Sequence, residues 1–409
     1  MLKGTPGPST ALGPSWLSLD LRKLIITFLI WLGFVGLWYL NALKHVGTLD
    51  FLQYWAALKL LLTQANPYSE VQLLAIQQAY WVEPLPFAIV LYCPPLIFPA
   101  LLLLAFLPSF EWAAAVWNAS ALFCLYLCVN RLICDAGASR TLYRRTLVFS
   151  VSFLPIYTLL YYGQVSHLLL IGLLPALGAL SAPAEQSKNS ILIGSGLALT
   201  FLKPHLLYIL YPVLGFIFLK RRSWGVLSSW ILCLTLLSVI PSFLNQNIWS
   251  NYLDFMTQPP IAWKTPTIGF WLQYMNGDTG MWSRMVFPLG LLFILALVGK
   301  NYFSYFGEKN AVLLLLPLTL ITSPYGWLFD QVLLLPLLIP LLAQRALFYV
   351  LMILNGFLVL IPNDWGQEYY VWYPFCVLII GVFGLQGADR GRCIPRGASN
   401  YSSGDSSAI

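Results

Sequence analysis

Long apolar runs separated by short polar connections dominate the hydrophobic and polar pattern of this chain. Twelve of the runs predict membrane-spanning helices, several of them short for a full crossing. The predicted spans are 24–43, 111–133, 147–161, 165–181, 190–203, 205–219, 224–243, 284–299, 311–323, 331–342, 346–362 and 374–386. The pattern therefore predicts an all-α polytopic membrane protein with a bundle of about twelve transmembrane helices.

One further apolar run, Phe87 to Leu107, is also long enough to cross a membrane. Cys93-Pro94-Pro95 and Pro99 divide it into pieces that are too short for a clean crossing. A crossing here would also carry the arginine-rich loop 131–145 to the outer side. We therefore predict that residues 87–107 form an interfacial or re-entrant helix on the outer side, buried against protein.

Composition and charge agree with this topology. Hydrophobic residues make up 59% of the chain and charged residues 9%, which is too apolar for a soluble domain. Seventeen of the 22 basic residues fall on the side of both termini, and five fall on the other: Lys44, Lys59, Lys203, Lys264 and Arg284. The positive-inside rule then predicts a multi-pass plasma-membrane protein with cytoplasmic termini. Basic residues in short inter-helix loops do not suggest nucleic acid as a partner.

The same pattern divides the chain into three parts. Residues 1–20 form a flexible cytoplasmic N-terminus, 21–386 the transmembrane domain, and 387–409 a disordered cytoplasmic tail. Two outer loops stand out, loop 44–110 with its interfacial helices and the aromatic loop 244–283. No cleavable signal peptide is recognised. None of the seven cysteines forms a CxxC pair, so neither a disulfide framework nor a zinc site is indicated.

Asp50 is the first acid after the first predicted span. From Phe51 to Leu62 the apolar and aromatic residues fall on one helical face, which predicts a short helix lying in the membrane interface. Asp50 stands at its N-terminal end, where an ordinary helix cap is one explanation.

Ionisable residues at membrane depth are costly and need an explanation. The predicted topology gathers several polar residues at the outer face, beside helix breaks: Asp50, Gln164, Lys203, His205, Arg284, Tyr325 and Asp330. Each also has an ordinary explanation, such as snorkelling for Lys203 and Arg284 or helix capping for Asp330. Their convergence from separate segments favours a site.

One acid opposite a Lys/His cluster at a membrane surface suits glycosyl transfer. The acid accepts a proton from an attacking sugar hydroxyl, and the cations hold a phosphate leaving group whose lipid tail stays in the bilayer. Displacement at the anomeric carbon with a single base predicts inversion. The sequence contains no paired carboxylates of a hydrolase, no Ser/His/Asp triad, no P-loop and no dense cluster of metal ligands. We therefore expect no cofactor and no metal site.

Over about residues 24–345 the chain resembles glycosyltransferase family 87, polyprenyl-phosphate-mannose-type enzymes of the GT-C superfamily. The resemblance rests on short motifs that occur in a fixed order: Asp50-Phe51-x-x-Tyr54-Trp55-Ala56-Ala57, Asn66-Pro67-Tyr68, Tyr92-x-Pro94-Pro95-Leu96, Gly163-Gln164-Val165, Leu202-Lys203-Pro204 and Ser323-Pro324-Tyr325-x-x-x-x-Asp330.

The resemblance implies a GT-C-type catalytic domain, catalytic Asp50, and a polyprenyl-phosphate-sugar donor presented from the outer side. Family members often carry a His where this chain has 323–330, which contains Tyr325 and no His. Lys203 and His205 are therefore the preferred phosphate ligands, with Arg284 as a third. The predicted sugar and acceptor pocket comprises Tyr54, Gln164, Tyr325 and Asp330. We expect a hexose, mannose in the first instance, to pass to an outer-face lipid or glycan acceptor.

Two other classes of protein remain as alternatives. A transporter or flippase of lipid-linked sugars would also use broken helices and intramembrane charges, but it would place ionisable residues near mid-membrane and contain inverted repeats, and neither feature is found. If the chain were a non-catalytic scaffold subunit, loss of Asp50 would leave the activity of its complex unchanged.

The topology generates a direct test. We expect a cysteine introduced at Ser69 to react with a membrane-impermeant thiol reagent added outside the cell, and one at Ser139 to stay unlabelled, because loop 44–110 and loop 131–145 lie on opposite sides. Labelling of Ser139→Cys but not of Ser69→Cys would contradict both the orientation and the re-entrant assignment of residues 87–107.

Overall fold

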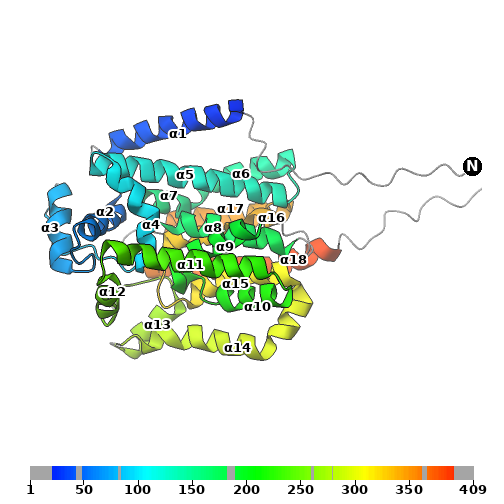
Figure 1. The fold of residues 1–409 in the computed structure, drawn as a ribbon. Helices are drawn as coiled ribbons and strands as arrows, with labels where there is room; N and C mark the ends of the chain where they lie inside the picture. The colour runs from blue at the N-terminus through cyan, green and yellow to red at the C-terminus, as the bar shows by residue number, and fades with distance from the viewer. Residues whose placement is uncertain are drawn as a thin grey trace, which may run out of the picture.

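A computed structural model describes residues 21–42, 48–81, 84–181, 189–258, 262–278, 280–361 and 366–390. Within these ranges the secondary structure is helical, with no β-strand. Most helices run along a common direction in one bundle (Figure 1). Three short helices, α2 (Leu49–Leu62), α3 (Glu70–Tyr80) and α12 (Ile248–Met256), gather at the left end in that view. Helix α1 begins, and α18 ends, at the opposite end.

The remaining helices fall into three groups along the chain. The first group runs from α1 to α8: α1 (Leu21–Ala42), η1 (Pro95–Ile97), α4 (Phe98–Leu101), η2 (Leu102–Phe106), α5 (Phe110–Asp135), α6 (Arg140–Ser152), α7 (Leu154–Tyr162) and α8 (Ser166–Leu180). The second contains α9 (Ser190–Thr200), η4 (Pro204–Leu206), α10 (Leu210–Lys220), α11 (Trp224–Leu244), α13 (Ile268–Asn276) and α14 (Trp282–Phe306). The third contains α15 (Glu308–Thr322), η5 (Leu328–Leu334), α16 (Leu335–Leu341), α17 (Arg345–Leu360), η7 (Gln367–Val371) and α18 (Trp372–Arg390).

The all-α prediction is confirmed for the described residues, and each predicted span coincides with a helix or a pair of consecutive helices. Four helical segments are long and apolar enough to cross a membrane: Phe110–Asp135, Trp224–Leu244, Trp282–Phe306 and Gln367–Leu385. Other apolar helices are shorter. The number twelve therefore stays a prediction. The predicted span 147–161 corresponds to the end of α6 plus α7, which are separated at Phe153, two residues before Pro155.

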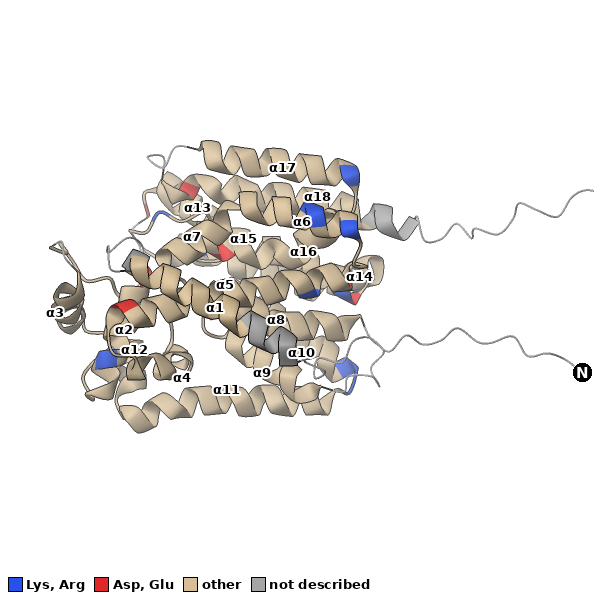
Figure 2. Cartoon of the chain, turned by 90° about the horizontal axis from the view of Figure 1, so that it is seen from above, with Lys and Arg blue, Asp and Glu red and all other residues tan. Residues whose placement is uncertain are grey.

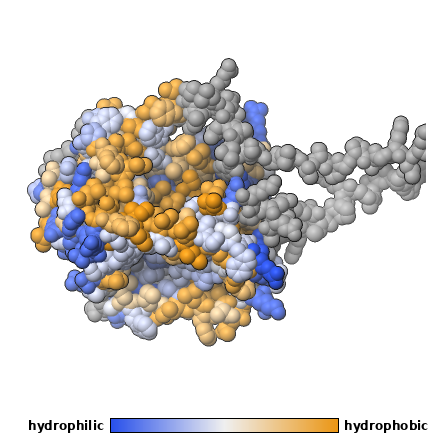
Figure 3. All heavy atoms as spheres, viewed as in Figure 1, coloured by the Kyte–Doolittle hydropathy of each residue, from blue (hydrophilic) through white to orange (hydrophobic). Residues whose placement is uncertain are grey.

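The sides of the bundle are apolar where a soluble protein would be polar. On α11, Ile231 is 66% exposed and Phe243 84%, and on α14 Phe293 is 65% exposed. Hydrophobic residues spread over the flank of the molecule, while hydrophilic ones gather towards its two ends (Figure 3). An exposed apolar surface of this extent fits hydrocarbon as the surrounding solvent, and the protein is a membrane protein.

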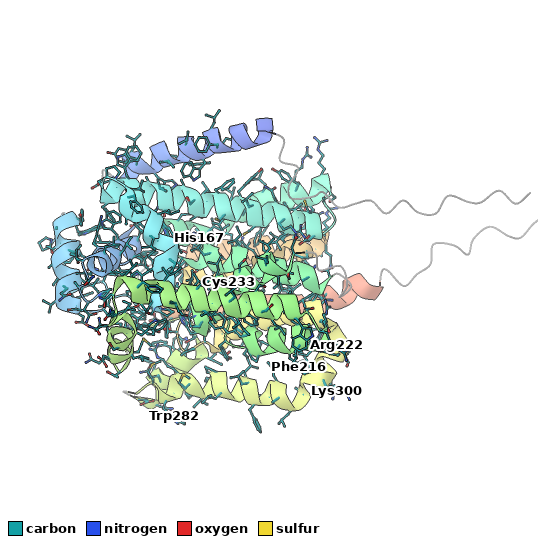
Figure 4. The ribbon with its side chains drawn as sticks, viewed as in Figure 1. His167, Phe216, Arg222, Cys233, Trp282 and Lys300 are labelled. Carbon is teal, nitrogen blue, oxygen red and sulfur yellow. The ribbon has the colours of Figure 1, made fainter. Side chains whose placement is uncertain are left out.

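Basic residues of the described helices concentrate at one end of the bundle. Lys and Arg gather where α6 and α17 begin and around the ends of α10 and α14 (Figure 2). Arg222 and Lys300 lie at this end, whereas Trp282, the first residue of α14, lies at the other (Figure 4). The asymmetry agrees with the charge pattern along the sequence.

The run 87–107 is broken as its prolines predict. Residues 84–94 form no regular helix, and the rest divides into η1, α4 and η2. Leu91, Ile97 and Phe98 are fully buried, so the segment packs against protein. Its place on the outer side of a membrane remains a prediction.

The prediction of a one-sided interfacial helix after Asp50 is wrong. Helix α2 is buried on almost every side, including Gln53, Tyr54 and Ala57. Asp50 is not the N-cap residue but the second residue of the helix, whose N-cap Thr48 makes no side-chain cap bond. The apolar stripe alone did not reveal that α3, α4 and α5 cover the other faces of α2.

The predicted domain boundary at residue 386 falls inside a helix, because α18 continues to Arg390. The predicted flexible segment 1–20 and residues 391–409 of the predicted tail lie outside the described residues. The aromatic loop 244–283 contains two short helices, α12 and α13.

Candidate functional site

The site forms where the turn between α7 and α8 touches the start of α2. Gly163 ends α7 in the left-handed conformation, with φ +70°. A Cβ atom at this position would lie 2.7 Å from the Cβ of Phe51. Glycine is therefore required at position 163 for two reasons, the positive φ and the close approach to α2. The Trp117 indole donates a hydrogen bond to the Gly163 carbonyl (2.8 Å), which fixes the turn from α5.

The start of α2 is held against the same turn. Thr48 adopts the left-handed conformation (φ 62°), which is strained for a β-branched residue. Its backbone N–H donates to the carbonyl of Tyr161, near the end of α7. This pairing brings Asp50, two residues later, beside the residue that follows Gly163.

Gln164 connects the site residues. Tyr54 Oη (3.1 Å) and Lys203 Nζ (3.0 Å) both donate to its Oε1 atom. Two donors on the oxygen fix the orientation of the amide, so its Nε2–H points to Asp50 Oδ2 at 2.6 Å. The amide thus lies between a cation and a carboxylate, and it donates to the carboxylate.

Lys203 and Asp330 form a buried ion pair. Their Nζ–Oδ1 distance is 2.9 Å, and their side chains are 8% and 1% exposed. Lys203 also reaches Ser166 Oγ at 3.4 Å, and the Ser166 hydroxyl donates to Asp330 Oδ1. The other carboxylate oxygen of Asp330 accepts the Trp327 backbone N–H (2.9 Å). Asp330 therefore caps η5, as its ordinary explanation suggests, and compensates a buried cation as well.

Burial raises the pKa of Asp50 from 3.8 to about 6, against the opposing effects of the Gln164 hydrogen bond and the Lys203 charge, while the Asp330 charge adds to the rise. A carboxylate with this pKa is mostly ionised at neutral pH and is more basic than an ordinary aspartate. Within the described part of the chain, Asp50 accepts one hydrogen bond, at Oδ2. Its Oδ1 atom accepts none from these residues.

His205 lies in η4, the break before α10, and stacks on Tyr325 beside this network, with ring centroids 3.9 Å apart. The Ser323 hydroxyl donates to the His205 carbonyl (3.1 Å) and so ties together the two helix breaks that follow α9 and α15. The His205 ring therefore lies at the break that follows Lys203, within reach of the same side of the bundle as Tyr325.

Arg284 is fully buried, and its guanidinium holds the outer loops together. It donates to Gln273 Oε1, to the Trp263 carbonyl and to the Pro324 carbonyl. These contacts fix the segment between α12 and α13 against the break after α15. The predicted role of Arg284 in binding phosphate stays a prediction.

Five of the eight predicted site residues thus lie in one hydrogen-bonded network, namely Asp50, Tyr54, Gln164, Lys203 and Asp330. Ser166 was missed by the sequence reasoning, although it stands two residues after Gln164. His167 Nδ1 lies 2.9 Å from the Gln164 carbonyl and braces the same turn. Among the described residues, no three His, Cys, Asp or Glu side chains lie close enough to hold a metal ion.

Comparison with known proteins gives one family. The sequence model described as glycosyltransferase family 87 matches residues 86–324, more than half of the chain. The match includes Gln164, Lys203 and His205 but ends before Asp330 and begins after Asp50. No curated protein and no solved structure matches the chain.

The buried pair generates a stability test. Lys203→Ala leaves the Asp330 carboxylate buried without its cation, so we expect a loss of about 3–5 kcal/mol in the free energy of unfolding. The double variant Lys203→Met/Asp330→Leu removes both charges and should recover most of this loss. Denaturation of the purified proteins in detergent measures both. Equal losses in the single and double variants would contradict the pairing.

Proposed function

Because this chain belongs to glycosyltransferase family 87, we propose that it transfers a hexose, mannose in the first instance, from a polyprenyl-phosphate-sugar to a lipid or glycan acceptor. The observation that carries the proposal is the Asp50 carboxylate, which burial makes more basic and which Gln164 orients. Such a group suits proton abstraction from a hydroxyl.

In the proposed reaction, Asp50 Oδ1 takes the proton of the acceptor hydroxyl as its oxygen attacks the anomeric carbon of the donor sugar. The bond between that carbon and the phosphate oxygen breaks, and the electron pair leaves with polyprenyl phosphate. Attack opposite the leaving group inverts the anomeric configuration. A phosphate leaves as an anion, so a second protein carboxylate acting as general acid is not needed.

The phosphate needs donors, and the candidates are Lys203 and His205. The three described hydrogen bonds of the Lys203 ammonium go to protein oxygens, and the one to Ser166 Oγ is the longest, at 3.4 Å. We propose that a phosphate oxygen of the donor replaces Ser166 there, while an imidazole N–H of His205 donates a second hydrogen bond. Tyr54, Gln164, Tyr325 and Asp330 would then surround the transferred sugar.

We further propose that the reaction takes place at the outer face of the plasma membrane, with both termini in the cytoplasm. The concentration of basic residues at the end of the bundle opposite α2 supports this orientation (Figure 2). The lipid tail of the donor would stay in the bilayer beside the apolar flank.

Asp50→Asn tests the base directly. The amide keeps the shape of the side chain and still accepts the Gln164 bond, but it cannot take a proton. We expect transfer to fall by about 10²–10⁴-fold while the protein folds and binds donor normally. The assay uses purified protein, radiolabelled polyprenyl-phosphate-mannose and candidate acceptors. Asp135→Asn, the same change at the opposite end of the bundle, is the control and should transfer normally. Near wild-type transfer by the Asp50→Asn variant would leave Asp50 without a catalytic role.

The pH profile tests the same group without mutation. Because the active form of Asp50 is the carboxylate and its pKa is about 6, kcat/KM should fall about tenfold per pH unit as the pH drops below 6. An ordinary aspartate would give this decline near pH 4. Measurement of kcat/KM from pH 4.5 to 8 distinguishes the two, and a profile that is flat down to pH 5 would argue against Asp50 as the base.

A further inference from the structure

Helices α2, α3 and α12 gather at one end of the bundle (Figure 1). A polar pocket of about 220 Å³ lies at this end. It forms between the connection from α2 to α3 and the last turns of α12. Polar side chains supply most of its lining: Asn66, Glu70, Asn251, Asp254 and Gln258. Pockets for drug-sized ligands are typically about 300–1,000 Å³, so this one suits a smaller molecule.

The polar groups of the pocket are available to a ligand. Within the described part of the chain, the side chains of Glu70, Asn251, Asp254 and Gln258 form no hydrogen bond or ion pair. The rings of Tyr68 and Phe255 complete the wall, with centroids 5.9 Å apart. Carboxylates and amides beside aromatic rings can bind the hydroxyls and the apolar C–H face of a sugar ring.

The pocket is connected to Asp50 through buried contacts. Tyr68 Oη donates to the Cys93 carbonyl (3.1 Å), and Cys93 Sγ lies 3.9 Å from Tyr54 Oη. Tyr54 in turn donates to Gln164, which donates to Asp50. The wall of the pocket and the proposed base are therefore held in a fixed relation by a few side chains.

A strip of aromatic rings leads from the pocket wall to His205. Phe255 packs on Tyr92 (centroids 4.8 Å apart), Tyr92 on Trp263 (4.5 Å) and Trp263 on Tyr325 (6.0 Å), the ring that stacks on His205. The first three rings are half-buried, so part of each stays accessible. Accessible aromatic faces in series can carry successive sugar rings.

We propose that this pocket binds one neutral sugar unit of the acceptor and that the aromatic strip of Phe255, Tyr92 and Trp263 supports the units between it and Asp50. The proposal rests on the proposed function and specifies its acceptor as a glycan or glycolipid with at least two sugar units. Glu70 and Asp254 disfavour an anionic sugar, because like charges repel in a shared pocket. A metal ion is a poorer occupant, since no third acid, His or Cys joins these two among the described residues.

The test measures binding rather than transfer. Neutral trisaccharides of mannose, of glucose and of galactose are titrated against the full-length protein in nanodiscs, with trigalacturonic acid as an anionic probe of matched size. Saturation-transfer NMR reports the contact and its concentration dependence. At least one neutral trisaccharide should bind saturably, and the anionic one should bind at least tenfold more weakly. If no neutral trisaccharide binds saturably, or if trigalacturonic acid binds as well, the proposal is wrong.

Matched variants on α12 then locate the site. Asp254→Ala should weaken binding of the neutral trisaccharide about tenfold or more, the scale of a lost hydrogen bond to a charged group. Ser250→Ala, one turn earlier on the same helix and outside the pocket lining, should bind like wild type. Equal affinity in the Asp254→Ala variant and wild type would overturn the proposal.

The two proposals fail separately. If the chain transfers no sugar but Asp254→Ala loses trisaccharide binding, the proposed function fails and the sugar pocket stands. If the chain transfers sugar but Asp254→Ala binds normally, the pocket assignment fails alone.

Discussion

The arrangement of the site depends on one constraint, the burial of the Lys203 ammonium against the Asp330 carboxylate inside an apolar bundle. An unpaired charge at this depth would cost several kcal/mol, so the segments after α9 and α15 must meet. Lys203 has more donors than one carboxylate uses, and Gln164 and Ser166 accept the others. The Lys203 ammonium therefore holds together the chain breaks that follow α7, α9 and α15.

Gln164 separates the cation from the proposed base. If Lys203 paired directly with Asp50, the pKa of that carboxyl would fall and it would be a weak base. The intervening amide accepts from Lys203 and donates to Asp50, so the carboxylate is oriented without forming an ion pair. Burial then dominates, and the pKa of Asp50 rises to about 6. The same buried surroundings thus keep the cation paired and make the carboxylate more basic.

The flank of the bundle and the end that carries α2 differ in polarity. The flank of the bundle is apolar and suits a lipid-borne donor, whereas the end that carries α2, α3 and α12 is aromatic and polar (Figures 1 and 3). Arg284 stabilises that end by binding the carbonyls of Trp263 and Pro324. In the proposed reaction, a glycan from the aqueous side and a lipid-linked sugar from the bilayer meet at Asp50.

The sequence by itself determined the all-helical class, the positions of the long apolar helices, the break at Pro94-Pro95, and most of the residues that meet in the network. These follow from local causes, namely runs of apolar residues, prolines, and charges too costly to bury unpaired. Only the tertiary structure decided that α2 is buried on nearly every side, that Asp330 pairs with Lys203, and that Arg284 holds loops together. It also revealed the pocket between Glu70 and Asp254. Each of these depends on which distant segments pack together, and a residue's own neighbours in the chain do not specify that.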